Sequence, residues 1–160
     1  MSSRRRQPVS EGALRSLSDV APELGQAITR FMTVAYPGRV DLVTRELVRI
    51  YSGRQSHCRI CSNLRLQAAL ERGFEESMVD YLDDLETSAL ETHQKAAVRL
   101  AQAFLGDPRS FDDAEQQELL RHFTAEQAAE LILDLVRYRP GSKLTIVSGT
   151  DPDLDGPVYS

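Results

Sequence analysis

Two cysteines separated by two residues, in the sequence Cys58-Arg59-Ile60-Cys61, are the residues of this chain best suited to chemistry. Two thiols at this spacing can close to a disulfide and reopen, and the thiolate is the reactive form. Ser56 is a predicted helix N-cap, because the run from Gly53 to Ser56 interrupts the preceding helical pattern. The positive end of a helix and nearby arginines favour a thiolate. The sequence therefore predicts a redox-active pair at a helix start, with two inert core cysteines as the alternative.

Glu46 is a second candidate, because it falls within the apolar stripe of a predicted helix from Val40 to Tyr51. An ionised carboxylate taken out of water is costly unless it finds a partner. We therefore expect Glu46 to have an assigned hydrogen-bonding role. The alternatives are a partly exposed residue at the edge of the stripe, or a pair with Arg45 or Arg49.

Three other uses of the cysteine pair are disfavoured. A structural zinc site needs about four ligands, and the chain has only two cysteines and three histidines, which are His57, His93 and His122. A bridge over three residues constrains little of the unfolded chain, so a purely structural staple is not expected. A thioredoxin-like site would need strands on both sides of the cysteine helix, whereas the pattern here is helical. We expect no metal and no organic cofactor.

Length and charge restrict the class of protein. The chain has 160 residues, a net charge of −5, 6% aromatic residues and no tryptophan. This length suits one domain, and the charge gives no general basic field for nucleic acid. Arg4, Arg5 and Arg6 form the only basic cluster, and we interpret it as part of a flexible tail. No secretory signal and no apolar run of membrane-spanning length follow it, so the expected location is the cytoplasm, without membrane or nucleic-acid partners.

The hydrophobic pattern predicts an all-α domain. The expected helices are Glu11–Leu17, Val20–Ala35, Val40–Tyr51, His57–Arg72, Glu75–Leu85, Leu90–Leu105, Asp113–His122 and Ala125–Tyr138. We assign residues 1–9 to a disordered basic terminus, 10–148 to a single helical domain and 149–160 to an acidic flexible tail. Arg139-Pro140-Gly141 should end the last long helix, and Leu144–Val147 should form a short extended arm.

The residues around the cysteines resemble a known family. Glu46, eleven intervening residues, Cys58-x-x-Cys61 and a following helix ending at Glu71-Arg72-Gly73 are similar to the alkylhydroperoxidase D and carboxymuconolactone decarboxylase-like family. A weaker similarity extends from Pro22 to Asp134. The resemblance implies an alkylhydroperoxidase D-like helical bundle that assembles as a homo-oligomer. It also implies that Cys61 reacts with peroxide, that Cys58 resolves it into a disulfide and that Glu46 helps to relay a proton.

One position departs from the family pattern. The relay histidine of the family falls four residues after the second cysteine, where this chain has Arg65. Arginine can stabilise a thiolate by its charge but cannot shuttle protons at working pH. His57 lies four residues before Cys61, which is the spacing of neighbours on a helix, so it is the candidate replacement base. The alternative for His57 is a solvent-facing residue in the first helical turn.

Three functions follow as hypotheses. The first is a thiol peroxidase or disulfide oxidoreductase that uses Cys58 and Cys61, with a small hydroperoxide as substrate and an unidentified thiol as reductant. The second is a redox sensor or structural homo-oligomer without turnover, which the missing histidine favours. The third is a decarboxylase or lactone-processing enzyme, for which the sequence supplies no acid–base set beyond Glu46 and His57. A homo-oligomer is expected because apolar residues surround most of the helix predicted at 125–138.

Overall fold

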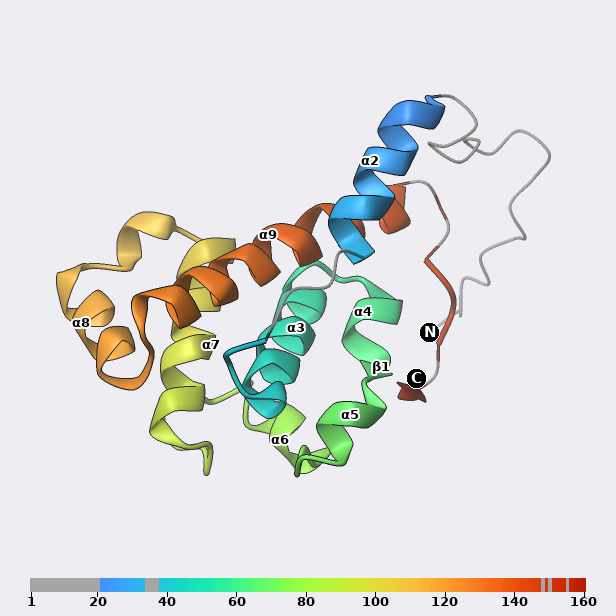
Figure 1. Cartoon of the computed structure of the whole chain (residues 1–160). Helices are drawn as coiled ribbons and strands as arrows, with labels where there is room; N and C mark the ends of the chain where they lie inside the picture. The colour runs from blue at the N-terminus through green and yellow to red at the C-terminus, as the bar shows by residue number, and fades with distance from the viewer. Residues whose placement is uncertain (1–20, 34–37, 148, 150, 155) are drawn as a thin grey trace.

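The computed structural model describes residues 21–33, 38–147, 149, 151–154 and 156–160, and these are mostly helical (Figure 1). Their helices are α2 (Pro22–Thr33), α3 (Leu42–Gln55), α4 (Arg59–Asn63), α5 (Gln67–Leu70), α6 (Ser77–Asp80), α7 (Thr92–Leu105), α8 (Asp113–His122) and α9 (Ala125–Val147), with a 3-10 turn at Pro108–Ser110. Two short strands, β1 (Leu64–Arg65) and β2 (Val158–Tyr159), form a parallel pair. The predicted all-α class is confirmed.

Helix α3 lies at the centre of the molecule and packs against α4, α7 and α9 (Figure 1). Its first turn is capped by Asp41, whose Oδ1 accepts a hydrogen bond of 2.8 Å from the amide of Thr44. The apolar side chains at its centre are fully buried together with residues of α7 and α9. The largest of these are Leu47, Ile50, Val98, Leu131 and Leu135. Burial of this stripe is the main source of stability for a helix of this kind.

The single helix predicted at 57–72 is wrong. His57 has a left-handed backbone with φ of 54°, Cys58 caps the short α4, and the chain becomes extended again at Leu64. Arg49 of α3 donates hydrogen bonds to the carbonyls of Cys61 and Leu64. In a continuous helix those carbonyls would accept from amides four residues later. A buried guanidinium therefore replaces the hydrogen bonds that would have carried the helix onward.

The predicted helix break at Arg139-Pro140-Gly141 is also wrong, because α9 runs through Pro140 to Val147. Proline removes one backbone hydrogen bond but leaves the rest of the ladder. The segment after Pro140 packs into the molecule, where Ser142 is fully buried and α9 contacts both α2 and α3. Tertiary packing thus outweighs the local cost, and 144–147 is helical rather than an extended arm.

The extended element lies later in the chain than the arm predicted at 144–147. It belongs to residues 151–154 and 156–160, which we call the C-terminal segment. Its strand β2 pairs with β1 in the register Leu64 to Val158 and Arg65 to Tyr159. The sequence predicted a loose tail from 149 onward, and these contacts with the same chain were not expected. The predicted terminus at 1–9, its three arginines and the helix at Glu11–Leu17 lie outside the described residues. The domain limits stay a prediction.

Candidate functional site

The two cysteines are joined as a disulfide, with their Cα atoms 5.3 Å apart. Cys58 is the N-cap residue of α4 and is fully buried, whereas Cys61 in the helix is partly exposed. The amide of Cys61 donates a hydrogen bond of 3.3 Å to Cys58 Sγ. The expected N-cap Ser56 is instead the C-cap of α3. The pair therefore has one shielded sulfur and one more accessible sulfur.

A close approach of two backbones places the disulfide on α3. A Cβ atom added at Gly53 would lie 2.6 Å from the carbonyl carbon of Cys61 and 2.7 Å from the amide nitrogen of Ser62. Only glycine leaves this space free. Gly53, which the sequence suggested as a helix breaker, lies inside α3 and allows α4 to pack directly against it.

Ser142 of α9 lies beside the second cysteine. Its Oγ lies 3.3 Å from Cys61 Sγ and 3.1 Å from the carbonyl of Tyr138, and its one hydrogen is shared between these two acceptors. Sequence reasoning missed Ser142, because it is 81 residues from Cys61 and lies beyond the predicted helix end. A serine at helical spacing from Tyr138 carries no local signal of contact with a sulfur.

Asp151 of the C-terminal segment lies beside the first cysteine. Its Oδ1 accepts hydrogen bonds of 3.1 Å and 3.3 Å from the amides of Arg59 and Ile60, and lies 3.9 Å from Cys58 Sγ. Two residues later, Asp153 forms an ion pair of 2.5 Å with the guanidinium of Arg59. Sequence reasoning assigned no role to this acidic stretch. The signal present in the sequence was a group of carboxylates, which could have been considered as acceptors for the hydrogen-bond donors around the cysteines.

Glu46 is buried and fully partnered. Arg49 holds it through two hydrogen bonds, 2.8 Å from Nε and 2.7 Å from Nη2, and the amide of Leu66 donates a third of 3.0 Å. A pair with Arg49 is one of the alternatives that the sequence leaves open for Glu46. Arg49 in turn reaches the carbonyl of Cys61 at 2.8 Å. Among the described contacts none joins Glu46 to a sulfur, so its role as a proton relay stays a prediction.

Arg65, which stands at the position of the family's relay histidine, and His57, its candidate replacement, lie on different elements of the structure. His57 is exposed, on the turn between α3 and α4. Arg65 lies on β1 and not on the cysteine helix, so the helical spacing used to place it near both thiols does not apply. Its guanidinium binds Glu76 at 2.7 Å and 2.6 Å and the carbonyl of Ser62 at 2.8 Å. The roles of both residues stay predictions.

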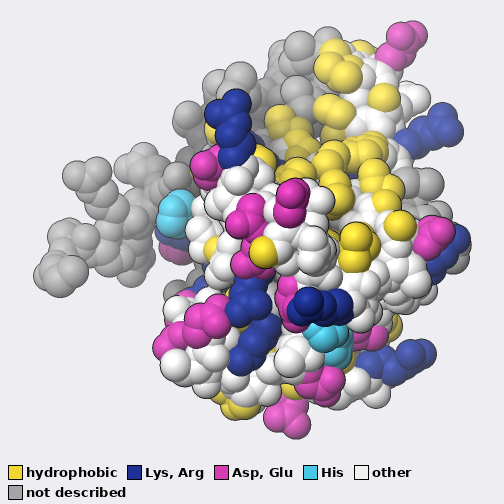
Figure 2. Space-filling view, turned by 90° about the vertical axis from the view of Figure 1, so that its left-hand side faces the viewer, with side chains coloured by type: hydrophobic (Ala, Val, Ile, Leu, Met, Phe, Trp, Pro, Cys, Tyr) yellow, Lys and Arg dark blue, Asp and Glu magenta, His cyan; other side chains and the backbone are white. Residues whose placement is uncertain are grey.

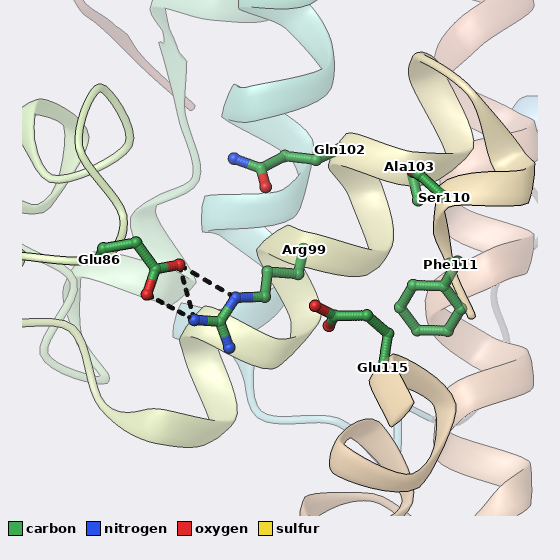
Figure 3. A pocket seen from close by; sticks show the side chains of 7 residues that line it. All are labelled: Glu86, Arg99, Gln102, Ala103, Ser110, Phe111 and Glu115. Carbon is green, nitrogen blue, oxygen red and sulfur yellow. Dashed lines mark hydrogen bonds and ion pairs between the residues drawn. The ribbon is translucent and has the colours of Figure 1, made fainter. Parts of the chain in front are cut away.

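The described residues line a polar cavity at each of two places. One of about 290 Å³ contains Arg99, which Figure 3 shows directed at Glu86, with Glu115 nearby. Hydrogen bonds from Arg99 to Glu86 raise the pKa of the arginine and leave the pair self-neutralised. The other, of about 250 Å³, is lined by Ser56 and Lys143 among others, which neighbour the cysteine segment and Ser142 in the chain. Its Tyr51 has a pKa raised by burial.

Within the described part of the chain, no three or more histidine, cysteine or acidic side chains are grouped so as to hold a metal ion. None of the described helices combines the length and the apolar character needed to cross a membrane.

Sequence comparison finds relatives without an assigned role. No family model matches the chain. It is 33% identical over 119 residues to two uncharacterized proteins of Mycobacterium tuberculosis, MT2376 of strain CDC 1551 / Oshkosh and Rv2313c of strain ATCC 25618 / H37Rv. The match covers 74% of this chain and 42% of each relative, so the chain spans less than half the length of the curated relatives it matches.

Structure comparison finds a similar fold. A protein of unknown function from Agrobacterium tumefaciens, ATU0492, which is suggested to be the antioxidant defence protein AhpD, superposes with a TM-score of 0.71 at 10% identity. The superposition covers 89% of this chain and 99% of that protein. At this identity the similarity shows the fold alone. The predicted alkylhydroperoxidase D-like all-α fold is confirmed.

Proposed function

We propose that this protein is a thiol-dependent peroxide reductase in which Cys61 is the reacting thiol and Cys58 the resolving one. The observation that carries the proposal is the asymmetry of the disulfide. Cys58 is fully buried and Cys61 is partly exposed beside a hydroxyl donor, on an alkylhydroperoxidase D-like fold. A nucleophile must meet its substrate, and a resolving thiol must meet only its partner.

The proposed reaction has three steps. The Cys61 thiolate attacks the terminal OH oxygen of a small hydroperoxide, the O–O bond breaks, and the leaving alkoxide becomes an alcohol by taking up the proton that the Cys61 thiol released. Cys61 is then a sulfenic acid. The Cys58 sulfur attacks the Cys61 sulfur, the S–OH bond breaks, and hydroxide with the Cys58 proton leaves as water. A dithiol reductant reduces the disulfide and is itself oxidised to a disulfide.

A pulse experiment tests the proposal. Reduced wild type, Cys58→Ser and Cys61→Ser are mixed with hydrogen peroxide or tert-butyl hydroperoxide, and thiols and sulfenic acids are trapped for mass spectrometry. We expect wild type to form the Cys58–Cys61 disulfide, Cys58→Ser to accumulate a sulfenic acid on Cys61, and Cys61→Ser to react slowly. The peroxidase proposal fails if neither wild-type thiol oxidises faster than free cysteine in solution.

The second candidate is a redox sensor without turnover. The contacts of Arg65 favour it, because the residue at the family histidine position is tied to Glu76 and cannot relay a proton. Peroxide consumption in the presence of excess dithiothreitol separates the two. Many equivalents of peroxide consumed per protein indicate an enzyme, whereas one equivalent followed by slow re-reduction indicates a sensor.

We also propose that the chain assembles as a homo-oligomer in the cytoplasm, where thiol reductants keep cysteines able to cycle. Figure 2 shows hydrophobic side chains gathered in a band on one face of the molecule. Exposed apolar side chains include Leu120 of α8 and Ile132, Leu133 and Val136 of α9. Analytical ultracentrifugation at micromolar concentration tests this, and a mass equal to one chain would contradict it.

A further inference from the structure

The two sulfurs of the disulfide face groups of opposite electrical character. Cys61 Sγ receives a hydrogen bond from the hydroxyl of Ser142 at 3.3 Å. Cys58 Sγ lies 3.9 Å from a carboxylate oxygen of Asp151. A hydrogen-bond donor favours the anionic form of a thiol, and a nearby negative charge disfavours it. The environment therefore treats the two cysteines differently once the disulfide is reduced.

The same carboxylate occupies the backbone donors next to Cys58. The amide of Arg59 lies 3.1 Å and 3.2 Å from the two Asp151 oxygens, and the amide of Ile60 lies 3.3 Å from Oδ1. A Cys58 thiolate would need such donors to replace the water it lacks as a fully buried residue. Asp151 already accepts both of these hydrogen bonds, which leaves the Cys61 amide, 3.3 Å from Cys58 Sγ, as the described donor to that sulfur. A charged Cys58 would therefore be buried with one backbone donor and beside a second negative charge.

The cations near the pair are engaged elsewhere. The guanidinium of Arg59 forms its ion pair with Asp153, that of Arg49 with Glu46 and that of Arg65 with Glu76. His57, the residue before Cys58, is exposed. Among the described residues, Asp151 is the charged side chain within 3.9 Å of the Cys58 sulfur, a distance at which the reduced thiol can donate to it.

We propose that Asp151 keeps Cys58 protonated in the reduced protein and thereby leaves Cys61 as the nucleophile. The inference rests on the proposed redox use of the pair and names the residue that assigns the two roles. In the reduced state the Cys58 thiol donates its hydrogen to Asp151. Cys58 gives up this proton only when its sulfur attacks the sulfenic acid on Cys61. Asp151 is positioned by its own hydrogen bonds to the amides of Arg59 and Ile60 and by the pairing of β2 with β1, so the C-terminal segment sets the order of reaction.

A titration of single thiols tests the inference without any peroxide. Cys58 is the only thiol of the Cys61→Ser variant, and ultraviolet thiolate absorbance reports its ionisation against pH regardless of access to reagents. Asp151→Asn is then added, because asparagine keeps the size of the side chain and an oxygen that accepts from the backbone amides while it removes the charge. Asp153→Asn on the same segment is the matched control, since its ion pair is with Arg59 and not with the sulfur.

We expect Asp151→Asn to raise the thiolate fraction of Cys58 at neutral pH on the order of 10-fold or more, the usual effect of one adjacent charge. Asp153→Asn should change it less than about 2-fold, as expected of a screened surface charge. In proteins with both cysteines, reduced wild type should react with iodoacetamide first at Cys61, and Asp151→Asn should increase the share of label on Cys58.

Two results would overturn the inference. One is an unchanged Cys58 titration in Asp151→Asn, and the other is an equal shift in Asp153→Asn, which would assign the effect to general charge. Neither result bears on peroxide reduction, which the peroxide pulse on wild type measures separately. Conversely, if Cys61 does not react with peroxide, the peroxidase proposal fails, and the titration of Cys58 still tests the effect of Asp151.

Discussion

Helix α3 carries two arginine–carboxylate clusters, and each stabilises the contact of α3 with a different part of the chain. Glu46 and Arg49, three residues apart on α3 itself, face the cysteine segment, and their remaining donors and acceptors bind the backbone of Cys61, Leu64 and Leu66. The second cluster faces α9. There Arg45 binds Asp134 at 2.8 Å and lies 3.6 Å from Glu130.

The two clusters differ in the hydrogen bonds that they supply to the backbone. The Glu46–Arg49 pair supplies hydrogen bonds to backbone groups at the end of the short α4 and in the extended stretch that follows it, namely those of Cys61, Leu64 and Leu66.

The Arg45 cluster joins α3 to α9, and its described hydrogen bonds to the backbone are made by a carboxylate: Glu130 accepts from the amides of Arg39 at 2.8 Å and Val40 at 3.4 Å. Asp134 also has a second arginine, since Arg137 lies 3.8 Å away. Loss of the arginine should therefore be more harmful in the first cluster, where Arg49 itself donates to backbone carbonyls, than in the second.

Arg49→Met should have the largest effect. It leaves Glu46 buried without its charge partner and removes the donors of two backbone carbonyls. We expect the free energy of unfolding to fall by about 3–5 kcal/mol, the range for breaking one side of a buried ion pair. Denaturant unfolding measures this. Arg99→Met is the control, since its similar pair with the largely exposed Glu86 should contribute about 1 kcal/mol or less.

Arg45→Met should cost less, about 1.5–3 kcal/mol, the range for hydrogen bonds to charged groups. Arg45 is partly exposed, and Arg137 remains near the Asp134 carboxylate after the substitution. The same unfolding experiment measures the loss, and thiol labelling of the reduced protein should match wild type because this cluster faces α9. If Arg45→Met proved more harmful than Arg49→Met, the distinction between the clusters would be wrong.

Gly53→Ala tests the contact between α3 and α4 without touching a charge. Alanine is favoured over glycine inside a helix by up to about 1 kcal/mol, but its Cβ would meet the Cys61 backbone. We expect a net loss of about 1–3 kcal/mol, as for other overpacked sites. Gly141→Ala in α9 is the matched control. Its Cβ would meet only the flexible end of Met32, so its stability should stay equal or rise.

Glu76→Gln should have the smallest effect, and it depends on pH. Hydrogen bonds from Arg65 hold the pKa of Glu76 below its ordinary value of 4.5. A carboxylate with a lowered pKa in the folded state stabilises the protein above about pH 4.5, and this contribution is lost as pH falls through the lower folded value. Wild type should exceed the variant in stability at neutral pH by a small margin, since Glu76 is half exposed. Thermal melts should show the margin shrinking in acid.

Several features of the fold could be predicted because they are local. The helix at Asp113–His122 was placed at its observed bounds, because a capping aspartate and a turn flank it. The start of α9 is likewise local, since the Gln127 amide lies 3.3 Å from Thr124 Oγ1 and the Thr124 amide lies 2.9 Å from Gln127 Oε1. The closeness of the two cysteines follows from their spacing in the chain. Burial of Glu46 followed from its apolar neighbours, with Arg49 among the partners considered.

The sequence by itself determined the helical class, the cysteine pair and its position after a central amphipathic helix, because periodicity, caps and short spacings are written in neighbouring residues. Only the tertiary structure decided what surrounds each sulfur. Ser142 and Asp151 reach the cysteines from 81 and 93 residues away, and Arg49 ends a helix that propensity alone would have continued. Such contacts depend on how helices pack, and a linear pattern holds no record of the partners that packing brings together.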